Sequence, residues 1–354
     1  MFSLYDYAYD LPEERIAQRP AAQRDQSRLL VMDRRSGTLS HRSFIDLDNL
    51  LAPSDVLVIN NTEVIPGRLY GRKDTGGRAE VLILDYAGRR SLEDTADEFD
   101  CECLVKSSKQ ARVGSVLHFD QGLAAEVLSV KDNIYTLKFR SPGNFEKILY
   151  GIGSVPLPPY IKREENPEST RDDRVTYQTV YASRRGAIAA PTAGFHFSTS
   201  FLKKIKARGV KVIEITLHIG YGTFLPVRVD DIREHRMHAE RYSVSNAAAE
   251  AINQARTAGS RIIAVGTTCV RTLEFLAGRD GMLQGAEGAC DLFIYPGYEF
   301  KIVDAMLTNF HLPKSTLLML VSAFAGRDNI LNAYREAVAK KYRFYSYGDA
   351  MFIA

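Results

Sequence analysis

The sequence predicts an α/β protein in which an inserted antiparallel β-barrel domain interrupts a discontinuous α/β domain with a mostly parallel sheet. Two observations predict this class. Apolar runs of strand length alternate with amphipathic helical segments in the second half of the chain, a pattern typical of a parallel sheet covered by helices. Between residues 68 and 156 the pattern changes to short alternating strands at roughly even spacing, which is typical of a small antiparallel barrel or sandwich.

Chain length and turn-forming residues predict where the domains meet. The chain has 354 residues, more than a single core usually serves, so two domains are expected. Pro66 and Gly67 precede the barrel-like segment, and the proline-rich residues 156–159 follow it. We therefore expect three stretches, which are the first part of the α/β domain at 1–66, the barrel at 67–154 and the remainder of the α/β domain at 155–354.

Composition narrows the class of protein further. With 46 basic and 43 acidic residues the chain is nearly neutral, so a contact with nucleic acid has to be a local patch. The spacing of Cys101, Cys103, Cys269 and Cys290 matches neither a zinc site nor a disulfide framework. There is no apolar leader and no apolar run of membrane-spanning length. We therefore expect a cytoplasmic monomer without a membrane contact.

The first elements of the α/β domain are predicted as strands. Residues 28–32 are predicted to form a strand, Gly37 marks a turn, and 56–59 form a continuous apolar run. Asn60, Asn61 and Thr62 end that run, and polar side chains at the carboxyl end of a buried strand often face a ligand. The barrel strands are expected at 80–84, 101–105, 115–119, 123–128 and 134–139.

Beyond the barrel, helices and strands are expected to alternate. Residues 199–208 place apolar side chains on one helical face and lysines on the other, with Gly209 as the C-cap. The following elements are strands at 210–217, 261–265, 292–295 and 303–307, and helices at 247–258, 269–276, 315–324 and 330–341.

The segment 189–238 is the first candidate site, because it holds four of the seven histidines. His196 follows Thr192 and Gly194, and it is equally well explained as a structural histidine or as a proton donor or acceptor. His218 ends a predicted strand and precedes Gly220 and Gly222, where open α/β sheets bind ligands, although a plain glycine-rich turn is also possible. His235 and His238 are three residues apart, but a third metal ligand at recognisable spacing is missing, so we expect no metal.

A second candidate site begins at Gly266, where a predicted strand turns directly into a helix. Exposed amides and the hydroxyls of Thr267 and Thr268 could hold a carboxylate or phosphate there, and Arg271 could add a contact to an anion, although a salt bridge is the commoner role. Cys269 could be nucleophilic at a helix start, but we interpret it as a packing residue. The motif is neither G-x-G-x-x-G nor a P-loop, so no dinucleotide or triphosphate fingerprint is present.

A third candidate site is formed by Asn309, Phe310 and His311, whose side chains suit hydrogen bonding and stacking on a heterocycle; an ordinary loop is the alternative. Two segments could bind nucleic acid. The helix face with Lys203, Lys204 and Lys206 could follow phosphates, and the tail at 342–347, with Tyr342 and Arg343, interleaves aromatic and basic side chains. A solvated helix face and ordinary aromatic packing are the alternatives.

Taken in order, these motifs resemble one family, the S-adenosylmethionine:tRNA ribosyltransferase-isomerases of queuosine biosynthesis. The resemblance covers essentially the whole chain. It also includes the motifs at 156–161 and 177–181, Gly222-Thr223-Phe224 and Met237-His238. Phe195, Tyr221 and Cys269 depart from the residues usual in the family. Because the family usually has serine where this chain has Cys269, the resemblance argues against an essential thiolate.

The resemblance implies a transferase that moves the ribosyl moiety of S-adenosylmethionine onto the aminomethyl group of 7-aminomethyl-7-deazaguanine at the tRNA wobble position. Epoxyqueuosine forms, while adenine and methionine leave. S-adenosylmethionine is consumed as a substrate, and no cofactor is expected. The implied partner is tRNA carrying the deazaguanine precursor.

Set against this chemistry, the histidines His196, His218 and His311 are the candidates for proton transfer, with base and acid unassigned. The predicted substrate-binding residues are Asn60, Asn61, Thr62, Thr192, Gly194, Gly222, Thr223, His238, Gly266, Thr267, Thr268, Arg271, Asn309 and Phe310. The predicted tRNA-binding residues are Lys203, Lys204, Lys206, Tyr342 and Arg343. A metal-dependent hydrolase and a non-catalytic RNA-binding protein remain the alternatives.

Overall fold

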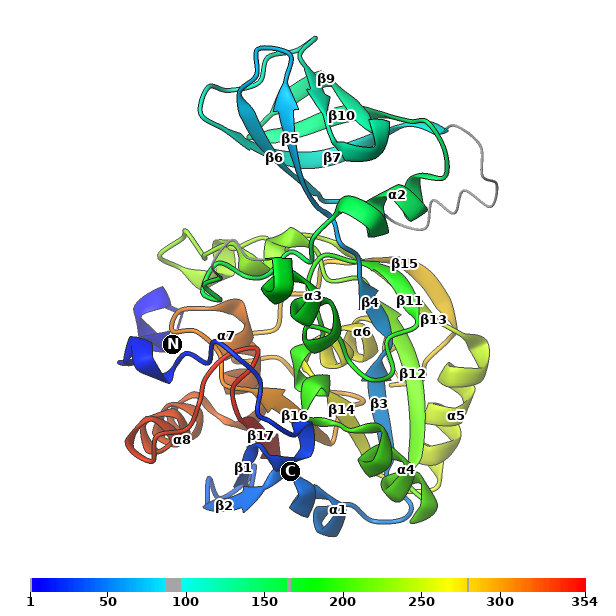
Figure 1. Ribbon diagram of the computed structural model, residues 1–354. Helices are drawn as coiled ribbons and strands as arrows, with labels where there is room; N and C mark the ends of the chain where they lie inside the picture. Colours follow the sequence, from blue (N-terminus) through cyan, green and yellow to red (C-terminus); the bar gives the residue numbers. More distant parts are fainter. Residues whose placement is uncertain (1, 87–96, 164–166, 279) are drawn as a thin grey trace.

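The protein, described here by a computed structural model, consists of a large α/β body with a β-barrel above it (Figure 1). The structure describes residues 2–86, 97–163, 167–278 and 280–354. Among these residues, no helix is long and apolar enough to cross a membrane.

A nine-stranded sheet forms the centre of the body, in the order β15-β13-β12-β3-β14-β16-β17-β1-β2. The neighbours β12, β3, β14 and β16 run parallel, as do β17 and β1. The antiparallel pairs are β15–β13, β13–β12, β16–β17 and β1–β2. The predicted fold class is thereby confirmed. The strands are β1 (Arg28–Met32), β2 (Leu39–Ser43), β3 (Val56–Asn60), β12 (Lys211–Leu217), β13 (Glu240–Val244), β14 (Ile262–Val265), β15 (Ala286–Cys290), β16 (Ala305–Asn309) and β17 (Ala350–Ile353).

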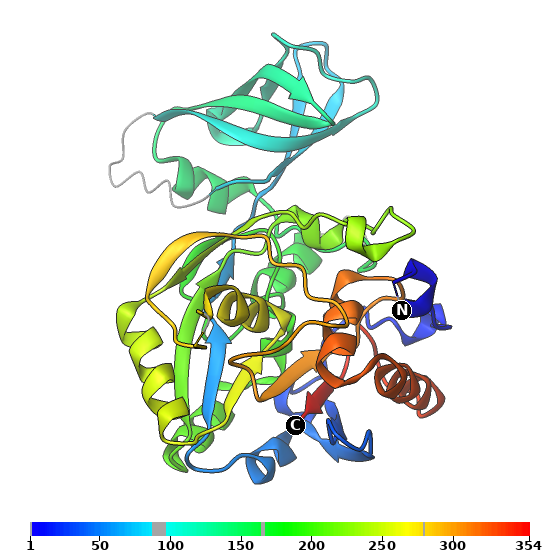
Figure 2. The same ribbon diagram turned by 180° about the vertical axis from the view of Figure 1, so that it is seen from behind.

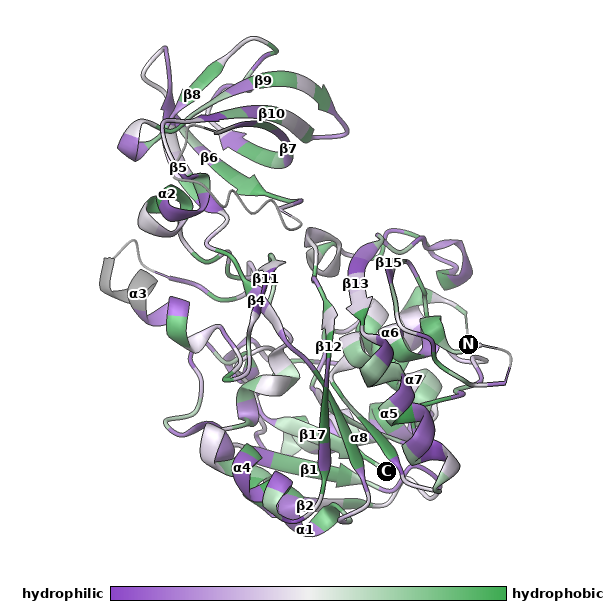
Figure 3. Ribbon diagram, turned by 90° about the vertical axis from the view of Figure 1, so that its right-hand side faces the viewer, coloured by the Kyte–Doolittle hydropathy of each residue, from purple (hydrophilic) through white to green (hydrophobic). Residues whose placement is uncertain are grey.

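Helices cover both faces of this sheet, which explains why its central strands are apolar throughout. Because side chains alternate along a strand, Val56 and Val58 of β3 enter the core under α5 to α8, whereas Leu57 and Ile59 enter the core under α1 and α4. Figure 3 shows the central strands in hydrophobic colours. The helices of the body are α1 (Leu47–Leu50), α3 (Pro167–Thr176), α4 (Thr199–Ala207), α5 (Asn246–Thr257), α6 (Thr267–Leu276), α7 (Thr316–Ala325) and α8 (Arg327–Ala339).

The inserted segment forms a closed antiparallel barrel in the order β10-β7-β6-β5-β8-β9. Its inward side chains form a separate apolar core, and α2 (Phe145–Ile152) contributes Phe145 and Leu149 to it. Asp132 and Asn133 take positive φ in the two-residue turn between β9 and β10, as such tight hairpins require. The strands are β5 (Arg68–Lys73), β6 (Arg78–Ile83), β7 (Asp97–Ser107), β8 (Val116–His118), β9 (Ala124–Lys131) and β10 (Ile134–Ser141).

Two chain passages join the barrel to the body, and they pair with each other. The backbones of Arg68 and Ser154 exchange two hydrogen bonds of 3.0 and 2.8 Å, and β4 (Thr62–Val64) pairs with β11 (Arg184–Ala187) just below. Both views of the ribbon show the barrel on this narrow neck (Figures 1 and 2).

One predicted strand is wrong. Residues 292–295 are not a strand, because β15 already occupies the edge beside β13 and the following apolar segment packs over the core as irregular chain. Conversely, three strands of the sheet, β13, β15 and β17, are missing from the predicted elements; β17 lies between β16 and β1.

Candidate active site

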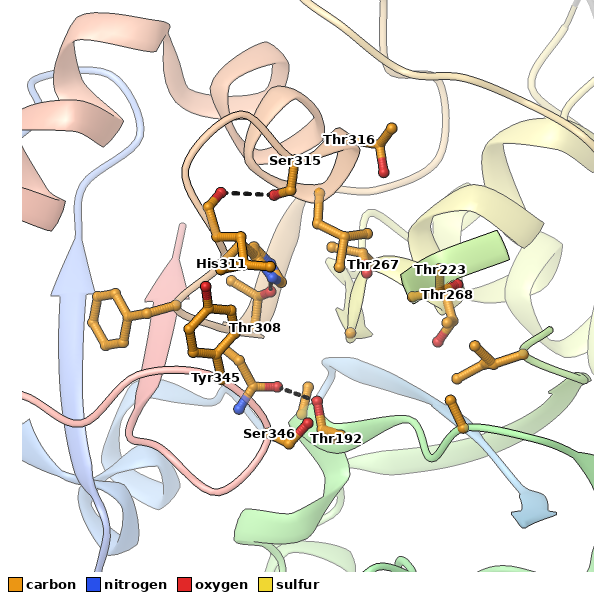
Figure 4. A pocket seen from close by; sticks show the side chains of 18 of the residues that line it. Thr192, Thr223, Thr267, Thr268, Thr308, His311, Ser315, Thr316, Tyr345 and Ser346 are labelled. Carbon is orange, nitrogen blue, oxygen red and sulfur yellow. Dashed lines mark hydrogen bonds between the residues drawn. The ribbon is translucent and has the colours of Figure 1, made fainter. Parts of the chain in front are cut away.

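A cavity of about 420 Å³ lies at the carboxyl ends of β14 and β16, the edge where open α/β sheets bind ligands. Threonine and serine side chains from separate segments of the chain surround it, among them Thr192, Thr223 and Thr268 (Figure 4). Its lining includes residues 189–193, 266–268 and 308–317, together with Thr223, Arg271, Tyr345 and Ser346. The structure therefore brings together parts of all three regions that the sequence singled out.

One wall of the cavity is the amino end of α6. Gly266 caps this helix with a φ of +88°, a conformation that favours glycine. The side-chain oxygen of Thr268 is buried and has no hydrogen-bond partner among the described residues. Since helix amino ends attract anions, this wall suits a carboxylate.

Arg271 also reaches the cavity, but its guanidinium is held by protein groups. It forms a buried ion pair with Glu240 and donates to the carbonyl of Leu292 at 3.1 Å. The other Glu240 oxygen accepts from the amide of Gly220 and from the hydroxyl of Thr223, both at 3.0 Å. Arg271 of α6 therefore contacts the loop that carries Thr223 through the carboxylate of Glu240, a residue that the sequence analysis did not identify.

The opposite wall contains His311, whose side chain is buried and lines the cavity. Its Nε2 lies 2.9 Å from the hydroxyl of Thr308. Tyr9 donates to the carbonyl of His311, and the hydroxyl of Tyr334 accepts from its amide at 3.0 Å. Burial lowers the pKa of His311 to about 3, so the imidazole is neutral near pH 7 and can accept a proton.

His196 lies behind this wall and does not line the cavity. Its Nδ1 is 2.7 Å from the hydroxyl of Ser27, and its Nε2 is 3.2 Å from the amide nitrogen of Asn309. The hydroxyl of Thr192 donates to the side-chain oxygen of Asn309 at 2.8 Å. Because an amide nitrogen only donates, Nε2 is the acceptor and Nδ1 carries the proton. Burial, followed by Arg343 and Arg24, lowers the pKa of His196 to about 3.

The arrangement gives His196 a positioning role. The neutral ring fixes the orientation of the Asn309 amide, and Asn309 and Thr192 reach the cavity. Phe310, between Asn309 and His311, is fully buried and packs its ring against Phe344 at 4.9 Å.

His218 and the run Asn60, Asn61 and Thr62 lie at the neighbouring strand ends, outside the cavity lining. The hydroxyl of Thr62 is 2.8 Å from Nδ1 of His218. Asn60 bridges β3 to β12 through both backbone groups of Leu217, and Asn61 accepts from Thr216 at 2.7 Å. Burial, followed by Arg241, lowers the pKa of His218. These polar groups hold the strand ends together.

The predicted glycines are explained by close packing. A Cβ on Gly194 would meet the hydroxyl of Tyr181 at 2.0 Å, and one on Gly222 would meet the side chain of His238 at 2.6 Å. His238 itself is exposed, beside the loop that carries Thr223. Glycine at both positions therefore permits side chains to pack directly against the backbone.

None of the five residues predicted to bind tRNA lines the cavity. Helix α4 precedes the amino end of β12, so Lys203, Lys204 and Lys206 lie at the opposite end of the sheet (Figure 1). Lys204 pairs with Asp48 at 2.8 Å. Tyr342 is fully buried under the guanidinium of Arg28, and Arg343 pairs with Asp349 at 3.6 Å.

Cys269 is fully buried, and burial raises the pKa of its thiol. This environment agrees with packing rather than nucleophilic attack. Within the described ranges, no group of three or more histidine, cysteine, aspartate or glutamate side chains is arranged to hold a metal ion.

Sequence reasoning missed several residues of the cavity wall, including Tyr160, Tyr345 and Ser346. The tail at 342–347 was interpreted as a nucleic-acid surface because its aromatic side chains alternate with polar ones. The structure folds it inward, so that Tyr345 and Ser346 reach the cavity while Tyr342 and Phe344 enter the core. For Tyr342 and Phe344 the structure therefore agrees with the alternative interpretation, ordinary aromatic packing.

Residues 4–353 match the family described as queuosine biosynthesis protein. A relative from Natranaerobius thermophilus is 51% identical over 354 residues, which is 99% of both chains, and one from Trichlorobacter lovleyi is 48% identical over 349 residues, which is 98% of both. Both are named S-adenosylmethionine:tRNA ribosyltransferase-isomerase.

A crystal structure of S-adenosylmethionine tRNA ribosyltransferase from Thermotoga maritima is 35% identical, with a TM-score of 0.55, and the match covers 99% of this chain and 100% of that one. Sequence and fold thus agree along the whole length, and the chain belongs to the queuosine biosynthesis protein family.

Proposed function

We propose that this chain is an S-adenosylmethionine:tRNA ribosyltransferase-isomerase that acts on tRNA carrying 7-aminomethyl-7-deazaguanine at the wobble position. One observation of the structure carries the proposal. The cavity has an anion-binding helix end on one side and imidazole and aromatic groups on the other, which suits a ligand with a carboxylate at one end and a purine at the other. Relatives at about 50% identity carry the name of this activity.

The reaction moves the ribosyl moiety of S-adenosylmethionine onto the aminomethyl nitrogen and yields epoxyqueuosine, adenine and methionine. A base removes a proton from the ribose carbon next to the sulfonium, whose positive charge acidifies that carbon. Adenine takes up a proton as it leaves, and the neutral amine attacks the sugar. S-adenosylmethionine is consumed, and the proposal requires no cofactor.

The cavity residues can be given roles in this scheme. His311 is the base candidate, because it is the histidine of the lining and its ring is neutral, with a nitrogen lone pair that can take up a proton. Gly266, Thr267 and Thr268 receive the methionine carboxylate at the amino end of α6. Asn309, held by His196 and Thr192, orients a hydroxyl or ring group of the ligand.

The tRNA is proposed to approach from the side of the barrel. A cleft of about 1320 Å³ lies between the barrel and the body, and it shares Pro159 with the cavity. Arg78 and Lys106 of the barrel line this cleft and are exposed, and no described acidic side chain forms an ion pair with them. Their charges are therefore available to phosphates.

The deciding experiment incubates the protein with S-adenosylmethionine and tRNA that carries the deazaguanine precursor. Free adenine and a correspondingly heavier nucleoside are expected. S-adenosylhomocysteine as the product would contradict the proposal, because it would indicate methyl transfer. Binding of tRNA without turnover would instead favour a non-catalytic RNA-binding protein, and turnover that is lost on chelation and restored by metal would favour the metal-dependent hydrolase.

A further inference from the structure

The side chain of Tyr345 lies in the cavity wall and has no part in the roles proposed for the other cavity residues. It is 95% buried, since its exposed fraction is 5%, and it lines the cavity. Its hydroxyl has no hydrogen-bond partner among the described residues. Because buried polar groups in folded proteins are nearly always partnered, this hydroxyl calls for a partner that the folded chain does not supply.

The backbone holds Tyr345 where a bulky residue is rarely found. Its φ is +69°, in the left-handed region that aromatic side chains seldom adopt. Hydrogen bonds fix the turn on both sides: the amide of Tyr345 donates to the carbonyl of Phe310 at 3.1 Å, and its carbonyl accepts from Gly348 at 2.9 Å. Asp349 closes the turn by accepting from the amide of Arg343 at 2.8 Å. Strain of this kind persists where the surroundings impose it, often at ligand sites.

The ring of Tyr345 is held as firmly as its backbone. It stacks on Tyr160 with ring centroids 4.5 Å apart and an interplanar angle of 24°. Tyr160 differs in one respect, because its hydroxyl is 2.7 Å from the hydroxyl of Ser346. Of two stacked tyrosines in the same cavity wall, one therefore has a hydroxyl partner in the described part of the chain and the other does not.

The position of Tyr345 indicates which part of the ligand it meets. In Figure 4 Tyr345 lies on the side of His311 and Thr308, away from Thr268 and Thr223. Thr268 marks the helix end that suits a carboxylate, so the opposite, aromatic side is left for the purine. A tyrosine hydroxyl can donate to a ring nitrogen, and burial raises the pKa of Tyr345, which keeps that proton in place at neutral pH.

We propose that Tyr345 is a specificity-determining residue whose hydroxyl donates a hydrogen bond to a ring nitrogen of the adenine of S-adenosylmethionine. This inference rests on the proposed function, since it assigns the base end of that substrate. It assigns the adenine end of the cavity to a residue on the turn at 343–349, far in sequence from the α6 turn.

The test compares Tyr345→Phe with Tyr181→Phe as a matched control. The hydroxyl of Tyr181 is also buried without a hydrogen-bond partner among the described residues, but Tyr181 does not line the cavity. Both changes remove one hydroxyl and keep the ring. At saturating precursor tRNA, Tyr345→Phe is expected to lower kcat/KM for S-adenosylmethionine about tenfold, as expected for a hydrogen bond lost from a buried group. Tyr181→Phe is expected to change kcat/KM less than threefold.

Deaza analogues identify the acceptor. S-adenosylmethionine is replaced in turn by its 1-deaza, 3-deaza and 7-deaza forms, each of which lacks one ring nitrogen. For one analogue, kcat/KM of the wild type is expected to be lower than for S-adenosylmethionine. With Tyr345→Phe the two substrates are expected to have similar kcat/KM, because two changes that remove the same contact are not additive. If the loss of kcat/KM from Tyr345→Phe and the loss from the analogue are additive for all three analogues, the inference is wrong.

Thermal unfolding without substrate provides a second readout. Removing a buried hydroxyl that has no partner is expected to leave Tm unchanged or to raise it in Tyr345→Phe, whereas Tyr160→Phe is expected to lower Tm. A clear fall of Tm in Tyr345→Phe together with unchanged kcat/KM would mean that a bound water or protein group partners this hydroxyl, and the inference would be wrong. Wild-type protein that releases no adenine would contradict the proposed function itself.

Discussion

The two ends of the parallel sheet are built differently. At the amino end, charged groups are paired with protein partners: Asp48 binds Lys204 and Arg208, and Asp55 binds Arg261 at 2.6 Å and the amide of Ala52 at 2.7 Å. At the carboxyl end, the buried hydroxyls of Thr268 and Tyr345 have no partner among the described residues. Polar groups at the first end therefore stabilise the fold, whereas the two hydroxyls at the second end are the ones that we propose meet the ligand.

The largest expected effect comes from the carboxyl end. His311→Asn is expected to lower turnover about 10²- to 10⁴-fold, because a general base contributes that much. His41→Asn is the control, since His41 contacts Tyr342 and Glu336 outside the cavity. Single-turnover adenine release measures both variants. Near-normal turnover of His311→Asn would remove this residue from the proton-transfer step.

Glu240→Gln tests whether a paired group at the carboxyl end serves the fold, the site or both. The change leaves Arg271 buried without its counter-charge and is expected to reduce the free energy of unfolding by about 3–5 kcal/mol. It also loosens Thr223, so KM for S-adenosylmethionine should rise. Asp55→Asn, at the amino end, is expected to reduce stability and leave KM unchanged. Denaturant unfolding and steady-state kinetics distinguish the two, and a matching rise in KM for Asp55→Asn would break the comparison.

The buried histidines predict a pH dependence of stability. Burial lowers their pKa values to about 3 in the folded protein, whereas the ordinary pKa of histidine is 6.5, so the unfolded chain binds more protons below pH 6.5. Stability is therefore full above pH 6.5 and falls as the pH drops from 6.5 towards 3, by up to about 1.4 kcal/mol per pH unit for each histidine. The double variant His196→Gln/His311→Gln should show a shallower fall in urea unfolding across this range; an identical slope would contradict the neutral assignment.

The smallest effect is expected for tRNA affinity, where opposite outcomes are expected for the barrel side of the cleft and for α4 of the body. Reversing the charge of Arg78 and Lys106 in the cleft should reduce the slope of log affinity against log salt by about two, one for each phosphate contact. Reversing Lys203, Lys204 and Lys206 on α4 should leave the slope unchanged, because α4 lies at the far end of the sheet. Filter binding over a series of salt concentrations measures both slopes. A reduced slope for the α4 variant and an unchanged slope for the cleft variant would indicate that tRNA binds α4 instead.

The fold class could be predicted from the sequence, because the spacing of apolar residues and the positions of turn-forming residues are local features of the chain. Continuous apolar strands such as Val56–Asn60 predicted a sheet covered on both faces, and alternating strands predicted the barrel. The site was harder to predict, because its geometry depends on contacts between distant residues. Nothing near His196 indicates that Ser27 and Asn309 enclose its ring. Glu240 and Tyr345 were missed for the same reason, since their partners, or the lack of one, arise only after folding.

The place of β17 in the sheet has a consequence for synthesis on the ribosome. This strand follows every other strand of the sheet in the chain, yet it lies between β16 and β1 and connects the β1 and β2 hairpin to the rest. The nascent barrel, which is continuous in sequence, can fold early. The sheet of the body stays divided until Ala350–Ile353 emerges. A chain interrupted shortly before β17 would therefore leave two unpaired apolar strand edges, and such edges mark incomplete products for aggregation or proteolysis.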